Sequence, residues 1–162
     1  MKRALLLLAL CMAIVAVNAC QPAFPERAAT LLQNADTLLV LSLNPARGAI
    51  DPKGFHGWPV LGEALIGDAD RKLFIEAVIT GIVPPGPEVT VCEITPRHGI
   101  RASSKMGTVD FVICFECSEV QILYSQGGQE YLVPNSILKA ALSRATTKAG
   151  IPVLPSALER TR

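Results

Sequence analysis

The stretch TVDFVICF, residues 108–115, decides the fold because it contains the strongest strand signal in the chain. Valine, isoleucine and phenylalanine dominate it, and these residues are favoured in strands. The segment 119–124 follows closely and predicts a neighbouring strand. Further back, TLLVLSL at 37–43 is apolar along nearly its whole length, which predicts a strand with a buried face.

Two further segments are weaker strand candidates. Residues 56–66 are interrupted by Pro59, and proline cannot donate to a sheet, so this segment is expected at an edge. Residues 88–94 (EVTVCEI) alternate in polarity as a strand does. The segments 46–55 and 95–107 are expected to be loops.

Helical spacing of apolar residues predicts two main helices. The first runs from Asp68 to about Val83 and ends at a run of prolines, with Leu73 and Phe74 on its apolar side. The second begins at Asn135 or Ser136 and ends before Gly150. A short helix is also expected near residues 26–34.

These elements predict an α+β domain over residues 37–154, followed by a frayed tail at 155–162. Strands and helices do not alternate strictly, so a doubly wound parallel sheet is disfavoured. We expect an antiparallel sheet of four to five strands with two helices packed on one face.

The first nineteen residues have the layout of a cleaved signal peptide. A basic start at Lys2 and Arg3 precedes an uncharged apolar run at 4–17, and small Ala19 closes the segment. The apolar run is shorter than the approximately 20 residues that a membrane-spanning helix needs. A permanent anchor helix is therefore the less favoured interpretation.

The sequence Val17-Asn18-Ala19-Cys20 resembles the lipobox of bacterial lipoproteins. The resemblance implies that Cys20 is acylated after cleavage and that residues 20–36 tether the domain to the lipid bilayer. Gln21 follows the cysteine, whereas lipoproteins kept in the inner membrane typically have aspartate there, so the outer membrane, facing the periplasm, is favoured. The alternative is an ordinary signal peptide cut after Ala19, which leaves Cys20 for a disulfide.

Composition sets limits on function. The 162 residues are 50% hydrophobic and carry 15 basic against 14 acidic side chains, a balance that argues against nucleic acid as a partner. Removal of residues 1–19 takes away Lys2 and Arg3 and changes the formal charge from +1 to −1. The remainder is typical of one globular domain.

Cys92, Cys114 and Cys117 would remain in the mature domain. In an oxidising compartment a disulfide from Cys92 to Cys114 or Cys117 is attractive. The sharper alternative is a zinc or copper site made of Cys92, His98, Cys114 and Cys117, since thiolates and imidazole suit these ions. A regular strand would place Cys114 and Cys117 on opposite faces, which disfavours that site. No other cofactor is expected.

Arg97 and Arg101 flank His98 in the expected loop at 95–107. Two guanidinium groups beside an imidazole predict an anion-binding site. Cys92 or Cys114 with His98 would make a nucleophile and base. The plainer interpretation is a solvated basic turn whose arginines pair with nearby acids.

The stretches FHGWPVLG (55–62), CEITPRHGIR (92–101) and VDFVICFEC (109–117) resemble a group of uncharacterised bacterial exported proteins. The resemblance implies a shared small α+β domain and no defined activity. We therefore expect a membrane-anchored envelope lipoprotein with a binding or structural role and an unknown envelope partner. A metal-binding or thiol–imidazole protein is the alternative.

Overall fold

The computed structural model describes residues 24–46, 51–87 and 92–155. Seven strands form one antiparallel sheet in the order β2-β1-β4-β5-β6-β7-β3, and three helices accompany it. The strands are β1 (Thr37–Leu43), β2 (Val60–Leu65), β3 (Ile82–Val83), β4 (His98–Ser104), β5 (Gly107–Cys114), β6 (Glu119–Tyr124) and β7 (Gln129–Pro134). The helices are α2 (Glu26–Gln33), α3 (Asp68–Gly81) and α4 (Ser136–Lys148).

The α+β class and the antiparallel sheet are confirmed, but the sheet is larger than expected. It has seven strands instead of four to five, and three helices instead of two. Strands β1, β2, β5 and β6 lie where the sequence placed strands. Strands β4, β7 and the two-residue β3 were not expected, and the short helix α2 packs as part of the fold.

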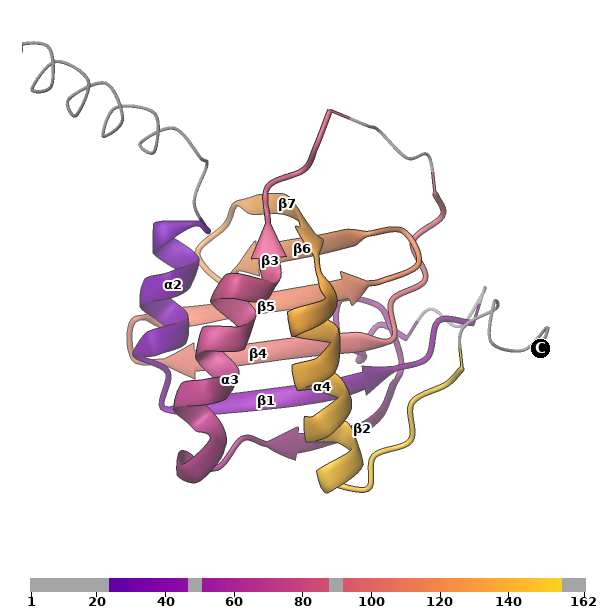
Figure 1. The fold of residues 1–162 in the computed structure, drawn as a ribbon, viewed down its shortest axis with the longest axis horizontal. Helices are drawn as coiled ribbons and strands as arrows, with labels where there is room; N and C mark the ends of the chain where they lie inside the picture. The colour runs from indigo at the N-terminus through magenta and orange to yellow at the C-terminus, as the bar shows by residue number, and fades with distance from the viewer. Residues whose placement is uncertain (1–23, 47–50, 88–91, 156–162) are drawn as a thin grey trace, which may run out of the picture.

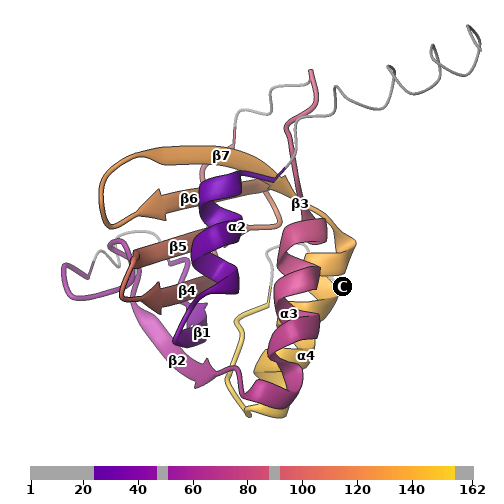
Figure 2. The same ribbon diagram turned by 90° about the vertical axis from the view of Figure 1, so that its left-hand side faces the viewer.

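All three helices lie on one face of the sheet, with α3 and α4 side by side and α2 over β4 and β5 (Figures 1 and 2). Alternate residues of the central strands point to these helices and form the main core. Its fully buried members from the sheet are Leu38, Val40, Ile100, Ala102, Val109, Phe111, Ile113, Val120 and Ile122. The short helix contributes Ala28, Leu31 and Leu32, so the folded body begins before residue 37.

The opposite face of the sheet carries a second, smaller core. Leu41 and Leu43 of β1 and Val112 of β5 pack there against Phe55, which comes from the connection between β1 and β2. Figure 2 shows this connection on the side of the sheet away from the helices. The described part of the molecule thus has a helical layer on one face, and the connection between β1 and β2 covers part of the other.

Strand β4 corrects the expected loop at 95–107. It pairs with β1 on one side and β5 on the other, so the segment lies inside the sheet. Only Ile100 and Ala102 are apolar and fully buried, while glycine, arginine and serine alternate with them. This weak apolar signal and the preceding Pro96 explain why the segment resembled a loop.

The expected helices are present with local differences. Helix α3 ends at Gly81, and Gly67 is its N-cap residue. Leu73 is 70% exposed, and Ile75 is buried in its place. For α4, the prediction is confirmed: the Asn135 side chain caps it by accepting hydrogen bonds from the backbone of Ile137 and Leu138.

Several predictions concern residues outside the described ranges. These are the signal peptide at 1–19, the acylated Cys20, the first part of the strand expected at 88–94 and most of the tail at 155–162. The described part of that strand, residues 92–94, has no regular secondary structure. Among the described helices, none combines the length and apolar character required to cross a bilayer.

Candidate functional site

The three stretches singled out in the sequence meet in the folded chain. Strands β4 and β5 pair directly, with Arg101 opposite Asp110. Phe55 lies on Gly99 so closely that a Cβ at position 99 would be 2.7 Å from its ring. The chemistry-bearing residues of all three stretches are therefore held on the two central strands and the segments that flank them.

Strand β4 divides the expected anion site between the two faces of the sheet. Successive side chains of a strand point to opposite sides. His98 and Ile100 face the helices, whereas Gly99 and Arg101 face the loop. Arg97, next to the strand, lies with His98 on the helical side. The structure therefore does not bring Arg97 and Arg101 together around one anion.

On the loop side, a buried carboxylate holds two basic side chains. Asp110 is 5% exposed and receives two hydrogen bonds from the Arg101 guanidinium, at 2.8 Å from Nε and 2.7 Å from Nη2. The Nε2 atom of His56 lies 2.7 Å from the Oδ2 atom of the same carboxylate. Burial favours a higher pKa for Asp110, but the hydrogen bonds and charges of Arg101 and His56 outweigh it and hold the pKa below its usual value.

The group formed by Asp110, Arg101 and His56 attaches the connection between β1 and β2 to the sheet. The Arg101 guanidinium carbon lies 5.1 Å from the centre of the Phe55 ring, and the His56 ring meets Phe55 edge-on. His56 has a positive φ of 53°, a conformation that few residue types adopt easily. The cluster is thus best described as a bidentate ion pair that positions residues 55–58.

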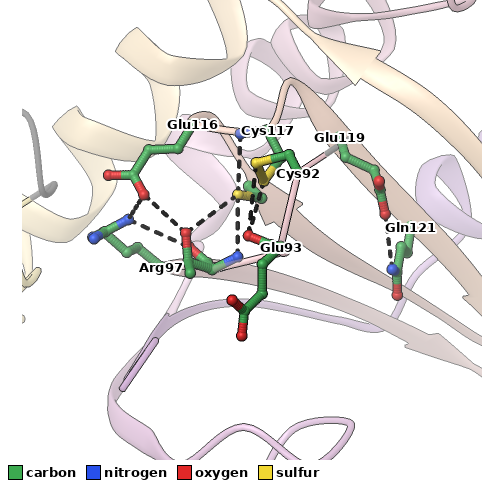
Figure 3. The surroundings of a disulfide bond; sticks show 9 residues. Cys92, Glu93, Arg97, Glu116, Cys117, Glu119 and Gln121 are labelled. Atoms are coloured by element: carbon green, nitrogen blue, oxygen red, sulfur yellow. Dashed lines mark hydrogen bonds and ion pairs between the residues drawn. A yellow bond between two sulfur atoms is a disulfide. The ribbon is translucent and has the colours of Figure 1, made fainter. Parts of the chain in front are cut away.

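Near the end of β5, a disulfide joins Cys92 to Cys117, with their Cα atoms 5.5 Å apart (Figure 3). The expected disulfide from Cys92 is confirmed, with Cys117 as its partner. Cys114 is a buried free thiol, and its sulfur accepts hydrogen bonds from the backbone nitrogens of Thr95 at 3.4 Å and Cys117 at 3.3 Å. The disulfide therefore ties the segment before β4 to the turn after β5.

The four residues of the expected metal site are not gathered around one point. Cys92 and Cys117 are bonded to each other, and His98 packs edge-on against Phe115. Within the described ranges, no group of three or more His, Cys, Asp or Glu side chains is placed to hold a metal ion. The sulfur of Cys114 is hydrogen-bonded to backbone amides, so the suggested nucleophile–base pair with His98 is not formed either.

Arg97 is neutralised by an acidic neighbour that the sequence analysis did not single out. Its Nη1 atom lies 3.0 Å from Oε2 of Glu116, and both side chains are largely buried. The Thr95 hydroxyl donates to the same carboxylate at 2.8 Å. Figure 3 shows the Arg97 and Glu116 side chains near the disulfide. The expectation of arginines paired with nearby acids thus describes Arg97 and Arg101 better than an open anion site does.

Behind this ion pair, a cavity of about 460 Å³ separates the sheet from helix α4 and the C-terminal segment. His98 and Phe115 line it from the sheet side and Lys139 from the helix. Burial, together with the charges of Arg97 and Lys139, lowers the pKa of His98 to about 4, so the imidazole is neutral at neutral pH. The Nδ1 atom of His98 and the Nε atom of Arg97 are buried without a hydrogen-bond partner in the described structure.

Sequence reasoning missed four residues of these sites: His56, Asp110, Glu116 and Lys139. For Asp110, the sequence could have predicted a partner. This aspartate interrupts the most apolar strand, and a buried carboxylate requires a hydrogen-bond donor or a positive charge beside it. The identity of that partner depended on the register of β4, which the sequence did not reveal.

No model of a protein family and no curated protein matches the chain. Among solved structures, the chain is similar to one described as a "putative lipoprotein from Clostridium perfringens", with 12% identity and a TM-score of 0.46. The match covers 79% of this chain and 99% of that one. At this distance the likeness supports no conclusion about function.

Proposed function

We propose that the protein is an exported lipoprotein of the bacterial envelope, anchored through acylated Cys20, whose domain serves as a binding module. The observation that carries the proposal is the disulfide between Cys92 and Cys117 in a chain that begins with a signal-like segment. Disulfides persist in oxidising compartments outside the cytoplasm. The lipobox-like sequence then supplies the means of attachment.

The length of the tether supports a position close to the membrane. The ring of Phe24 stacks on Phe111 of the core, and α2 begins two residues later. Phe24 is four residue steps from Cys20, and an extended chain spans at most about 3.6 Å per residue. A connection this short would hold Phe24 within about 15 Å of the acylated Cys20, so that this side of the domain lies near the lipid surface.

A binding role is favoured over catalysis by how the reactive side chains are used. Asp110 is tied to Arg101 and His56, and Arg97 is tied to Glu116. Two of the three described cysteines are joined as a disulfide. These groups are paired with one another and stabilise the fold. The cavity beside them has the space to hold a small molecule, which favours a binding role.

The anchoring is tested with Cys20→Ala in the intact chain, followed by membrane fractionation and labelling with a radioactive fatty acid. We expect the wild type to be labelled and membrane-bound, and the variant to be unlabelled and uncleaved at this site. Cys11→Ala is the matched control, because it removes a cysteine from the signal-like segment without changing the lipobox. Equal labelling of the Cys20→Ala variant and the wild type would contradict the proposal.

The outer-membrane location is tested separately with Gln21→Asp. If Gln21 directs the lipoprotein outward, the variant should collect in the inner-membrane fraction of a density gradient with its acylation unchanged. An unchanged distribution would remove the argument for the outer membrane while leaving the anchor itself intact.

A further inference from the structure

The cavity between β4, the turn after β5 and α4 has walls of two chemical kinds. Lys139, Ser143 and Thr147 of α4 supply an ammonium group and hydroxyls. Phe115 and the C-terminal segment, through Val153 and Leu154, supply apolar surface. Val153 and Leu154 are 36% and 39% exposed, so part of that apolar surface faces solvent. A volume of about 460 Å³ lies within the range of pockets that hold small molecules.

The C-terminal segment that forms the apolar wall is fixed to the sheet. The Ser42 hydroxyl of β1 donates a hydrogen bond to the carbonyl of Pro152. Ile151 lies against Gly62 of β2, where a Cβ would approach its side chain to 2.8 Å. The first contact comes from β1 and the second from its neighbour β2 at the edge of the sheet. Together they hold residues 151–154 in place opposite α4.

The charges around the cavity leave one cation without an acidic partner. Arg97 is balanced by Glu116 at 3.0 Å. In the described part of the chain, no carboxylate lies within ion-pair distance of Lys139, whose Nζ atom instead sits 5.9 Å from the centre of the Phe115 ring. The low pKa of His98, about 4, reflects the same positive surroundings after the larger effect of burial. The cavity therefore favours a negative charge near Lys139.

We propose that this cavity binds a small monocarboxylate that carries an apolar group. The carboxylate would lie at Lys139 with the hydroxyls of Ser143 and Thr147 as donors, and the apolar part would cover Phe115, Val153 and Leu154. Among the residues that the structure describes, Lys139 is the cavity's cation without an ion-pair partner, so a single negative charge matches it, and the Glu116 carboxylate in the same lining disfavours a dianion such as a phosphate monoester.

This inference deepens the proposed binding role and does not depend on the lipid anchor. Binding to the cavity and acylation of Cys20 are measured in separate experiments, so either can fail while the other holds. The larger hollow of about 610 Å³ between α3 and α4 is a weaker candidate, because the ion pair of Lys148 with Asp70 already balances charge there.

The test uses the purified full chain in lipid nanodiscs, with empty nanodiscs as the blank, and isothermal titration calorimetry. The probe is 4-phenylbutyrate, compared with 4-phenylbutanol, 4-phenylbutylamine and 4-phenylbutyl phosphate at pH 7. We expect saturable binding of one carboxylate per chain, about fivefold tighter than the alcohol, as a partly exposed charge contact provides. The amine and the phosphate should bind more weakly than the carboxylate.

Two variants locate the binding. Lys139→Met should weaken the carboxylate about fivefold and leave the affinity for the alcohol unchanged, because an exposed methionine keeps the apolar stem. Lys72→Met, an exposed lysine of α3 outside the cavity, is the matched control and should change neither. Ser143→Trp should fill the cavity and abolish binding of every probe.

Three outcomes would overturn the proposal. The first is no saturable binding of 4-phenylbutyrate to the wild type. The second is tighter binding of the phosphate or the amine, which would reject the monocarboxylate. The third is binding that Ser143→Trp and Lys139→Met leave unchanged, which would place the ligand elsewhere.

Discussion

His98, on the helical face of the sheet, makes the stability of the folded protein depend on pH. Its imidazole is largely buried, and burial together with Arg97 and Lys139 lowers its pKa from 6.5 to about 4. Between these two values the unfolded chain binds a proton that the folded protein does not. Stability therefore should be complete above about pH 6.5 and should fall as the pH drops toward 4.

We expect this histidine to contribute about 3 kcal/mol of pH dependence between pH 7 and pH 4, since each unit of pKa shift corresponds to about 1.4 kcal/mol. Urea unfolding of the wild type and of His98→Gln at several pH values measures it. The variant should lose this part of the slope, because glutamine does not titrate. Parallel curves for the two proteins would show that His98 is not the group responsible.

At the scale of elements, the described part of the connection between β1 and β2 is attached to the open face of the sheet through Phe55 and His56. Phe55 and Trp58 exchange two backbone hydrogen bonds, and Phe55 seats on Gly99. In the described part of the loop, the hydrogen bond between His56 and Asp110 attaches it to a charged side chain of the sheet. Because hydrogen bonds to charged groups contribute about 1.5–3 kcal/mol, this single bond should account for much of the loop's stability.

His56→Asn tests this attachment, because asparagine tolerates the positive φ but lacks the imidazole. Trp58 is the only tryptophan in the chain, so acrylamide quenching of its fluorescence reports on the loop alone. We expect stronger quenching in the variant, with the unfolding midpoint changed less than the quenching. Lys53→Ala, an exposed change in the same loop, is the control. Identical quenching in the wild type and His56→Asn would refute the attachment.

Some of these elements could be predicted from the sequence, and others could not. Strands β1, β5 and β6 and the capped helix α4 were predictable, because each has a continuous apolar pattern or a side-chain cap. Strand β4 was not predictable, because its own two buried apolar residues give only a weak strand pattern. Its pairing with β1 on one side and with β5 on the other stabilises it as a strand. The error mattered for function, since a loop would have kept Arg97, His98 and Arg101 on one surface, whereas a strand separates them.

At the scale of the whole molecule, the disulfide adds a covalent link between the segment before β4 and the turn after β5, which also touch through hydrogen bonds and an ion pair. Cys92 precedes central strand β4, and Cys117 follows β5, at a sequence separation of 25. The strand pair between these cysteines lies in the middle of the sheet and contributes to both cores. Restricting this segment in the unfolded chain should therefore stabilise the protein as a unit and not one layer alone.

For a closed loop of this length, chain entropy predicts that removing the disulfide costs about 3.5 kcal/mol. The double variant Cys92→Ser/Cys117→Ser should unfold at a correspondingly lower urea concentration, with a single transition retained because both cores share β4 and β5. Adding a reductant should destabilise the wild type and have no effect on the double variant, which makes the variant its own control.

The disulfide also links stability to cellular location. Wild-type protein kept in the reducing cytoplasm should have the same unfolding midpoint as the double variant, and wild-type protein recovered from the envelope should have a higher one. If the cytoplasmic and envelope forms unfolded identically, the bond would not form in the cell, and the main support for an exported domain would be lost.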